Sequence, residues 1–275
     1  MRWLVASCAG LTLGLLAALA GWRSTRRQFD DYRNDNAPAV TPREGPCATS
    51  GLVAHWTLDS AEITDLRDRS GLGNDLTAAG SFVPWATLRF GGPKPVEGRV
   101  GGAVSLALHQ WFVGPNNACF ASNVVSVAAW IWLEDPARVP TLIAKSNWPS
   151  DGWWLMTTSL DPLGSDRLLQ LGISSGNSVH HVDAGYQLPL REWHHIAVSI
   201  DNAAHEVRFF VDGEAHGPVH RNVPTWLVNW SHPIVLGDYD GTGRWPWHGR
   251  LDDVRVYNRV IADAEVKAAF GGRAP

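Results

Sequence analysis

Short stretches in which apolar and polar residues alternate recur along this 275-residue chain, with turn-forming residues between them. Because successive side chains of a strand point to opposite faces, such alternation is typical of half-buried β-strands. Strands at this spacing, joined by turns such as Asp212-Gly213, predict an all-β antiparallel sandwich of two sheets. The expected strands are Leu52–Leu58, Ala103–Leu108, Val124–Leu133, Thr141–Lys145, Trp153–Thr158, Leu168–Ile173, Val179–Val182, His195–Ile200, Val207–Val211, Ile234–Leu236 and Leu251–Tyr257.

One stretch near the C-terminus predicts a short helix instead. Residues Ala262–Phe270 place Asp263 and Glu265 in the first turn, where they favour the helix dipole, and Gly271 follows as a stop. With 45% hydrophobic and 18% charged residues, the chain has enough apolar side chains for a sizeable core. The net charge of −4, without a basic run, argues against nucleic-acid binding.

The N-terminus (residues 1–22) is apolar and predicts export. Residues Trp3–Trp22 carry no charge and are long enough to cross a bilayer core of about 30 Å. Two interpretations remain open: a signal peptide cleaved after Ala18-Leu19-Ala20, or an uncleaved anchor with Trp at both membrane interfaces. In either case we expect the domain to face the periplasm or the exterior. The anchor would be a single N-terminal transmembrane helix that holds the domain there, and this is the localisation that we expect.

Residues 23–50 are polar, lack periodicity and predict a linker to one domain over residues 51–275. Export also defines the redox environment of the cysteines. Cys8 lies in the apolar segment, which leaves Cys47 and Cys119 as an even pair in an oxidising compartment. A disulfide between them is the favoured interpretation, and two buried free thiols are the alternative.

Several motifs together resemble a known family. The stretches "REWHHIAVSID" (Arg191–Asp201) and "EVRFFVDGE" (Glu206–Glu214) resemble paired strands of the laminin-G-like jelly rolls in the concanavalin A-like lectin/glucanase superfamily. Further matching pieces follow in the expected order and cover residues 51 to 270. These are "GLVAHWTLD" (Gly51–Asp59), "DRSGLGNDL" (Asp68–Leu76), "GRVGGAVSL" (Gly98–Leu106), "SVAAWIWL" (Ser126–Leu133) and "GRLDDVRVYNRVIADAEV" (Gly249–Val266). The resemblance implies a jelly-roll fold.

The resemblance also implies a structural calcium ion. In many relatives the acid before the "VRVY" strand binds calcium, together with residues of the first strand and the loop after it; the matching positions are Asp252, Asp59, Asp68 and Asn74. Such oxygen donors suit Ca²⁺. The residues alone allow a second interpretation, in which Asp252 caps its strand and Asp68 forms an Asx turn with Ser70.

The sequence gives little support for catalysis. Glucanases of this superfamily carry an E-x-D-x-E run on one strand, and this chain has none. The stretch "GISSG" (Gly172–Gly176) matches a nucleophile motif formally but reads as a hairpin loop rather than a strand–turn–helix. The two pairs of adjacent histidines are His180-His181 and His194-His195. The members of each pair point to opposite faces of a strand, so neither pair can chelate one metal. We therefore expect no enzymatic activity.

The 15 tryptophans are the remaining signal. Trp56, Trp130, Trp132 and Trp193 match family strand positions, and most of them are expected in the core. Others fall in predicted loops, where rings could contact a protein partner or a glycan, or simply close the ends of the sandwich. The candidate contact residues are Trp148, Trp153, Trp226, Trp230, Trp245 and Trp247.

Together these features predict a recognition domain. The expected function is that of an accessory subunit of a membrane-associated protein assembly, with protein partners and with the membrane contacted through the N-terminal segment. The alternative is a calcium-dependent, lectin-like glycan-binding protein.

Overall fold

A computed structural model describes Cys47 and residues 51–59, 65–80, 92–108, 110–134, 140–147, 150–158, 167–176, 178–225, 232–243 and 245–272. The predicted apolar segment (1–22) and all of the predicted linker except Cys47 lie outside the described residues. No helix within these ranges is both long enough and apolar enough to span a membrane.

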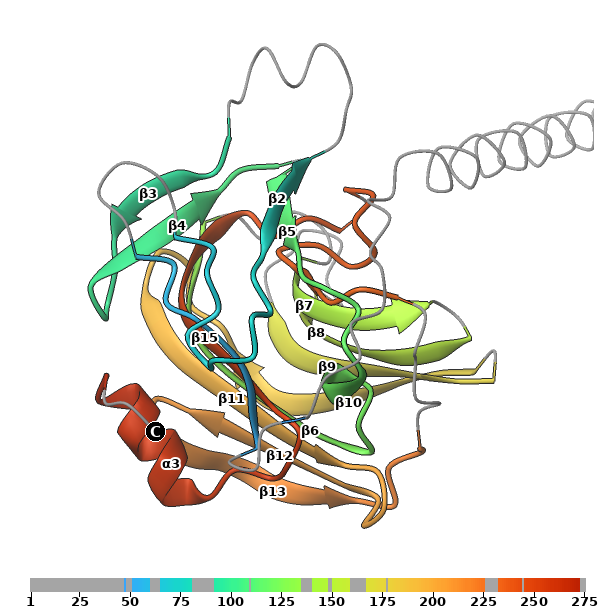
Figure 1. Cartoon of the computed structure of the whole chain (residues 1–275). Helices are drawn as coiled ribbons and strands as arrows, with labels where there is room; N and C mark the ends of the chain where they lie inside the picture. Colours follow the sequence, from blue (N-terminus) through green and yellow to red (C-terminus); the bar gives the residue numbers. More distant parts are fainter. Residues whose placement is uncertain are drawn as a thin grey trace, which may run out of the picture. The chain divides into compact units, whose positions relative to one another are not determined.

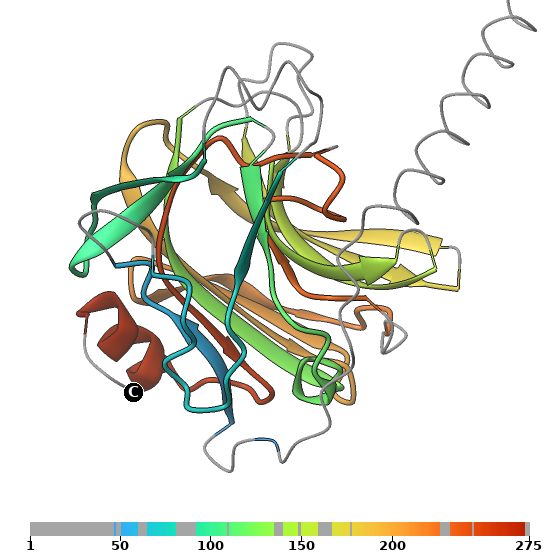
Figure 2. The same cartoon turned by 45° about the horizontal axis from the view of Figure 1, so that its top comes forward.

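The described chain folds into two antiparallel sheets that face each other (Figures 1 and 2). The eight-stranded sheet has the order β13-β12-β11-β6-β15-β4-β3, and β1 also pairs with β15. Its strands are β1 (Leu52–Trp56), β3 (Lys94–Glu97), β4 (Gly102–Leu106), β6 (Val124–Leu133), β11 (Trp193–Asp201), β12 (Glu206–Val211), β13 (Glu214–Arg221) and β15 (Gly249–Tyr257).

The seven-stranded sheet has the order β10-β9-β8-β7-β14-β5-β2. Its strands are β2 (Thr77–Gly80), β5 (Gln110–Val113), β7 (Thr141–Asn147), β8 (Asp151–Thr158), β9 (Leu168–Ser175), β10 (Ser178–Gln187) and β14 (Val235–Leu236). A short 3₁₀ helix, η1 (Ala118–Phe120), precedes β6. The predicted antiparallel sandwich is confirmed.

The core lies between the sheets and follows the alternation of the strands. On β6, Ala129 and Ile131 face the core, whereas Trp130 and Trp132 face outward. Burial of apolar side chains contributes roughly 25 cal/mol per Å² of area removed from water, so this layer supplies most of the stability. The large side chains within it include Trp56, Phe112, Trp153, Phe209 and Trp247.

The predicted C-terminal helix is α3 (Asp263–Phe270), which lies on the outer face of the eight-stranded sheet (Figure 1). Ala262 at the N-cap offers no side-chain acceptor. Glu265 compensates, because its carboxylate accepts the Ala262 backbone N–H (2.9 Å) and a hydrogen bond from Arg259 (2.8 Å). Val266 buries its side chain against Ala128 of β6 and thereby fixes the helix on the sheet.

Candidate functional site

Two adjacent acids, Asp252 and Asp253, lie at a β-bulge in β15. The register with β6 shifts between Asp252 and Arg255, and Asp253 takes a left-handed backbone conformation (φ 48°). An extra residue in a strand bends it and re-aims the side chains that follow. As a result, both carboxyl groups are buried instead of pointing to opposite faces of the sheet.

Asp253 is held by two basic side chains. Its Oδ1 lies 2.5 Å from His55 Nε2 of β1, and its Oδ2 lies 2.9 Å from Arg255 Nη2. Burial alone would raise the pKa of this carboxyl group, but the hydrogen bond from His55 and the charge of Arg255 outweigh burial and lower the pKa of Asp253. The three side chains form an ion network that ties β1 to β15, in which Asp253 and Arg255 are buried and His55 is partly exposed.

Asp252 and Asp59 meet at the turn that precedes β4. Asp252 Oδ2 accepts the backbone N–H groups of Arg99 (2.6 Å) and Val100 (2.9 Å), and Asp59 Oδ1 accepts that of Gly102. Asp252 Oδ1 is buried and has no hydrogen-bond partner among the residues that the structure describes. Burial, together with the charges of nearby acids including Asp59, raises the pKa of Asp252 to about 7. The two hydrogen bonds to Oδ2 therefore only partly offset the cost of burying the Asp252 carboxylate.

The turn can approach both acids because it carries glycines. A Cβ atom added to Gly98 would lie 2.6 Å from Asp252 Oδ2, and one added to Gly101 would lie 2.3 Å from Asp59 Oδ1. Neither separation is possible for real atoms, so any larger residue would force the turn away from the acids. Gly101 also has φ +77°, which other residues rarely adopt.

Both carboxylate oxygens of Asp68 are occupied by hydrogen bonds to the loop after β1 and to β1. Oδ1 accepts the backbone N–H groups of His55 (2.9 Å) and Ser70 (2.8 Å). Oδ2 accepts the Ser70 hydroxyl (2.7 Å) and the Asn74 backbone N–H (2.9 Å). This is the Asx turn that the residues alone allowed, and it attaches the loop after β1 to β1 itself.

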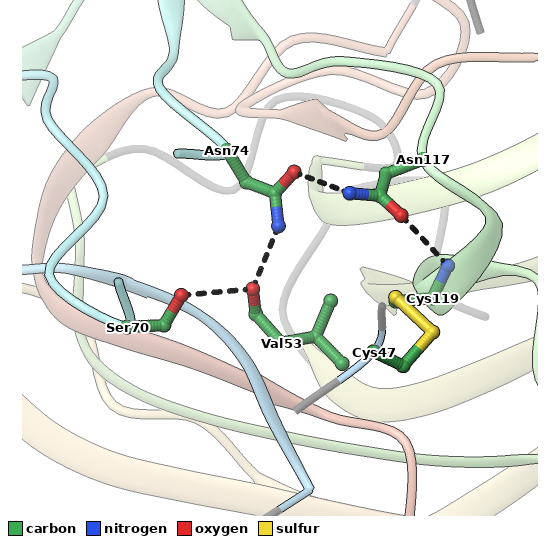
Figure 3. The surroundings of a disulfide bond; sticks show 6 residues. All are labelled: Cys47, Val53, Ser70, Asn74, Asn117 and Cys119. Atoms are coloured by element: carbon green, nitrogen blue, oxygen red, sulfur yellow. Dashed lines mark hydrogen bonds between the residues drawn. A yellow bond between two sulfur atoms is a disulfide. The ribbon is translucent and has the colours of Figure 1, made fainter. Parts of the chain in front are cut away.

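Asn74 belongs to the network beside the disulfide (Figure 3). Its Nδ2 donates to the Val53 carbonyl (2.8 Å), and its Oδ1 accepts from Asn117 Nδ2 (2.9 Å). Asn117 Oδ1 in turn accepts the Cys119 backbone N–H (2.9 Å). The predicted Cys47–Cys119 disulfide is present, with an S–S distance of 2.08 Å. Both amide oxygens thus serve the structure of this corner.

The four predicted calcium ligands therefore separate into two groups. Asp59 and Asp252 come together, while the side-chain oxygens of Asp68 and Asn74 are committed to hydrogen bonds elsewhere. Over the described ranges, no three His, Cys, Asp or Glu side chains form a group that could hold a metal ion. The set of Asp252, Asp59, Asp68 and Asn74 as ligands of one ion stays a prediction. The unpartnered Asp252 Oδ1 beside Asp59 is the one position in this set that suits a cation, and calcium binding remains a prediction.

That prediction can be tested by thermal unfolding. If Ca²⁺ binds between Asp59 and Asp252, calcium at a hundred times its Kd should stabilise the protein by about 2.7 kcal/mol. D252N should abolish the calcium-dependent shift in Tm. The exposed control D263N should retain it. A wild-type Tm that is unchanged between calcium and chelator would contradict the prediction.

The predicted contact tryptophans have different positions in the structure. Trp153 and Trp247 are 1% and 0% exposed, so their prediction as contact residues is wrong. Trp153 lies within β8 rather than in a loop, and its side chain points into the core. Trp247 packs in the same core, and its backbone N–H donates to the Gly237 carbonyl. Trp245 is partly exposed. Trp148, Trp226 and Trp230 lie outside the described residues.

Trp245 belongs to an aromatic cluster with Trp154 and Tyr239 on the outer face of the seven-stranded sheet. The ring centroids of Trp154 and Tyr239 are 5.1 Å apart, and those of Tyr239 and Trp245 are 4.7 Å apart. The Trp154 indole lies over Gly172, where any Cβ atom would come within 2.0 Å of the ring. The Tyr239 hydroxyl lies 3.0 Å from Ser146 Oγ. These contacts fix Trp245 at the surface of a rigid cluster.

A buried acid shapes the loop that carries the aromatic cluster. Asp238 accepts the backbone N–H groups of Gly243 (2.8 Å) and Trp245 (3.1 Å). Burial, and then the charge of Asp240, raise the pKa of Asp238 to about 6 despite these hydrogen bonds. The loop therefore holds a carboxyl group that is more easily neutralised than in the unfolded chain.

This pKa shift predicts a pH-dependent stability. A raised folded-state pKa stabilises the fold below the unfolded pKa of 3.8, and that contribution is lost as the pH rises to about 6. The change should be on the order of 2–3 kcal/mol, since each pKa unit corresponds to about 1.4 kcal/mol. We expect urea unfolding from pH 4 to pH 7 to show this decline in the wild type. In D238N, the part of this decline in unfolding free energy that comes from Asp238 should be absent. If the variant and the wild type show the same pH profile, the prediction is wrong.

Sequence reasoning missed a second aromatic surface, on the outer face of the eight-stranded sheet. The rings of Trp132 and Trp193 meet edge to face with centroids 5.9 Å apart, and both are partly exposed rather than core. Arg250 stacks 4.5 Å above the Trp132 ring. Glu134 accepts from the Trp132 indole (3.0 Å) and from Arg191 (2.9 Å), and these two contacts lower its pKa. The sequence signal that could have placed Trp132 outward is its position next to Ile131, which faces the core.

The chain belongs to the concanavalin A-like lectin/glucanases superfamily, whose laminin-G-type family model matches residues 109–267. The fold and the motif resemblance agree with this assignment. No curated protein sequence matches the chain.

Solved structures share the fold at low sequence identity. Domain 4 of AbnA, a GH43 extracellular arabinanase from Geobacillus stearothermophilus in complex with arabinotriose, matches with a TM-score of 0.61 and 21% identity over 78% of this chain and 96% of that chain. The binding domain of Paraclostridial Mosquitocidal Protein 1 matches at 0.59 and 16%, over 80% and 52%. The binding domain of Botulinum neurotoxin DC, in complex with rat synaptotagmin II, matches at 0.54 and 9%, over 81% and 51%. At these identities the likeness concerns the fold.

Proposed function

We propose that this chain is a non-catalytic recognition domain, exported and tethered by residues 1–22, that serves as an accessory subunit of a membrane-associated protein assembly. The observation that carries the proposal is the partly exposed pair of Trp132 and Trp193, ordered by Arg250 and Glu134. Tryptophan and arginine are the residue types that dominate hot spots of protein interfaces. A tether would raise the effective concentration of this surface near its partner.

The contacts of Trp132 favour a protein over a sugar at this place. Arg250 covers one face of the indole, and the ring N–H is already bonded to Glu134. A sugar ring that stacks on an aromatic side chain needs an open face. A protein partner can instead pack against the ring edges and pair with the guanidinium group, which presents a fixed fork of donors to a carboxylate.

Gentle detergent extraction, affinity isolation of the full chain and mass spectrometry test this function. We expect stoichiometric membrane proteins to accompany the wild type, together with an intact N-terminal peptide. W132A combined with W193A should lose these partners. W245A, on the other sheet, is the matched control and should keep them. A lone soluble chain that begins near Gly21 would contradict the tethered-subunit proposal.

Glycan recognition at the aromatic cluster is the second candidate. It is favoured by the partly exposed Trp245 beside Tyr239 and by the arabinotriose bound to the arabinanase domain of similar fold. A glycan array probed with and without calcium tests it. Binding lost in W245A and kept in W193A would support this function. A folded protein that binds no glycan would contradict glycan recognition.

A further inference from the structure

Five side chains form one straight row across the outer face of the eight-stranded sheet. Cross-strand pairing places Lys94 of β3 opposite Ser105 of β4, and Ser105 opposite Arg250 of β15. The pairing then continues from Arg250 to Trp132 of β6 and from Trp132 to Trp193 of β11. Residues directly opposite in paired strands share one face, so the row is continuous over five strands.

The row remains accessible, unlike its neighbours on the same face. On β6 and β11, the next position on that face holds Trp130 and His195, which are buried where Phe270 of α3 stacks on Trp130. In the row, by contrast, Lys94 is exposed and the other four side chains are partly exposed. The helix thus covers one part of this face and leaves the row open.

Charge is distributed unevenly along the row. Lys94 at one end and Arg250 in the middle are the cationic members, and neither lies within ion-pair distance of an acid among the residues that the structure describes, although the charge of Arg250 acts on Glu134. The other end is aromatic, with Trp132 and Trp193. Glu134 lies beside this aromatic end, already bonded to Arg191. A ligand must therefore present negative charge at one end only.

We infer that this row binds an extended acidic segment of a protein partner, with its carboxylates toward Lys94 and Arg250 and an apolar side chain against Trp193. The inference rests on the proposed accessory-subunit function and names the chemistry of the partner. A uniformly anionic polysaccharide fits less well, because its charges would continue past Trp132 toward Glu134. Arg250 and Lys94 would each gain a charge-assisted hydrogen bond, which is the stronger kind.

The dimensions of the sheet set the pattern of that segment. Adjacent strands lie about 4.8 Å apart, so the row spans about 19 Å from Lys94 to Trp193. A chain in the extended polyproline II conformation rises about 3.1 Å per residue and returns every third side chain to the same side, so roughly seven residues cross the row. Lys94 and Arg250 are two strands apart, as are Arg250 and Trp193. The matching segment carries acids about three residues apart and an apolar residue about three further on.

A peptide array probed with the full-length chain in detergent tests this inference. The seven-residue probes carry Asp or Glu at positions 1 and 4 and Leu or Phe at position 7. We expect these to bind and their Asn/Gln counterparts to bind at least tenfold more weakly. Reversed-order and uniformly acidic probes should also be weaker. Binding should fall as salt rises, because the contacts are between exposed charges.

Three substitutions locate the binding to the row. K94Q, R250Q and W193A should each weaken binding of the best probe about tenfold or more, with Tm unchanged because these side chains are not in the core. K267Q, which removes an exposed charge on α3, is the matched control and should bind normally. Peptide binding that survives both R250Q and W193A would overturn the inference. Preferred binding to polygalacturonate or heparin, included as soluble competitors, would also overturn it.

The co-isolation experiment separates failure of the inference from failure of the proposed function. If no acidic probe binds but R250Q still removes the membrane partners, the surface is a protein interface of other chemistry and only the acidic segment is wrong. If neither R250Q nor W193A changes the isolated partners, both the row and the interface proposed at Trp132 and Trp193 are wrong.

Discussion

Replacing Asp253 by Ala should destabilise the fold by about 3–5 kcal/mol, one of the largest effects that a single substitution can have here. The change leaves the Arg255 guanidinium, 3% exposed, without its buried counter-charge and removes the partner of His55. Breaking a buried ion pair is costly because the remaining charge is uncompensated, whatever the net worth of the intact pair. Urea unfolding of the purified chain at pH 7 measures the loss.

The neighbouring acid provides the comparison for this prediction. D252N removes a carboxylate whose pKa is already raised to about 7, so at neutral pH and without calcium it should change stability far less than D253A. D263A, in an exposed pair with Arg208, should change it by less than about 1 kcal/mol. Equal losses in D253A and D252N would show that the two acids are not distinguished by their partners.

This difference between two adjacent acids could not be read from the sequence. The resemblance named Asp252 as a calcium ligand, and nothing in the sequence assigned a role to Asp253. The bulge buries both. Which acid finds a counter-charge depends on His55 and on the turn that precedes β4, far away in the chain. Such long-range partners leave no local pattern, and so the ion network of Asp253 was not anticipated.

The strand series was predictable where alternation and β-propensity agree. The expected strands match β6, β8, β11, β12 and β15 closely. The sequence did not indicate β2 ("TAAG"), β3 ("KPVE") or β13 ("EAHGPVHR"), because small residues, Pro and Gly have low β-propensity. All three are the outermost strands of their sheets. Pairing with a neighbour, rather than local preference, makes them strands.

The tryptophans show the same limit for the candidate sites. Trp132 and Trp193 match family strand positions, which favoured burial, but both rings are partly exposed. Trp153 and Trp247 were assigned to loops, which favoured exposure, but both rings are buried. Alternation within β6 and β8 decides which face a ring occupies, but it does not reveal which outer face a helix covers. Phe270 buries Trp130 and leaves Trp132 accessible two residues further along the same strand.

Removing the Cys47–Cys119 disulfide should cost about 4 kcal/mol, since the bond closes a loop of 72 residues and thereby restricts the unfolded chain. The bond also anchors η1, whose Asn117 bridges to Asn74 and the loop after β1. We expect C47S combined with C119S to show this loss in urea unfolding, and dithiothreitol to lower the wild type to the same level while leaving the double variant unchanged. A wild type that is insensitive to dithiothreitol, and equal in stability to the double variant, would mean that the hydrogen-bonded corner holds without the bond.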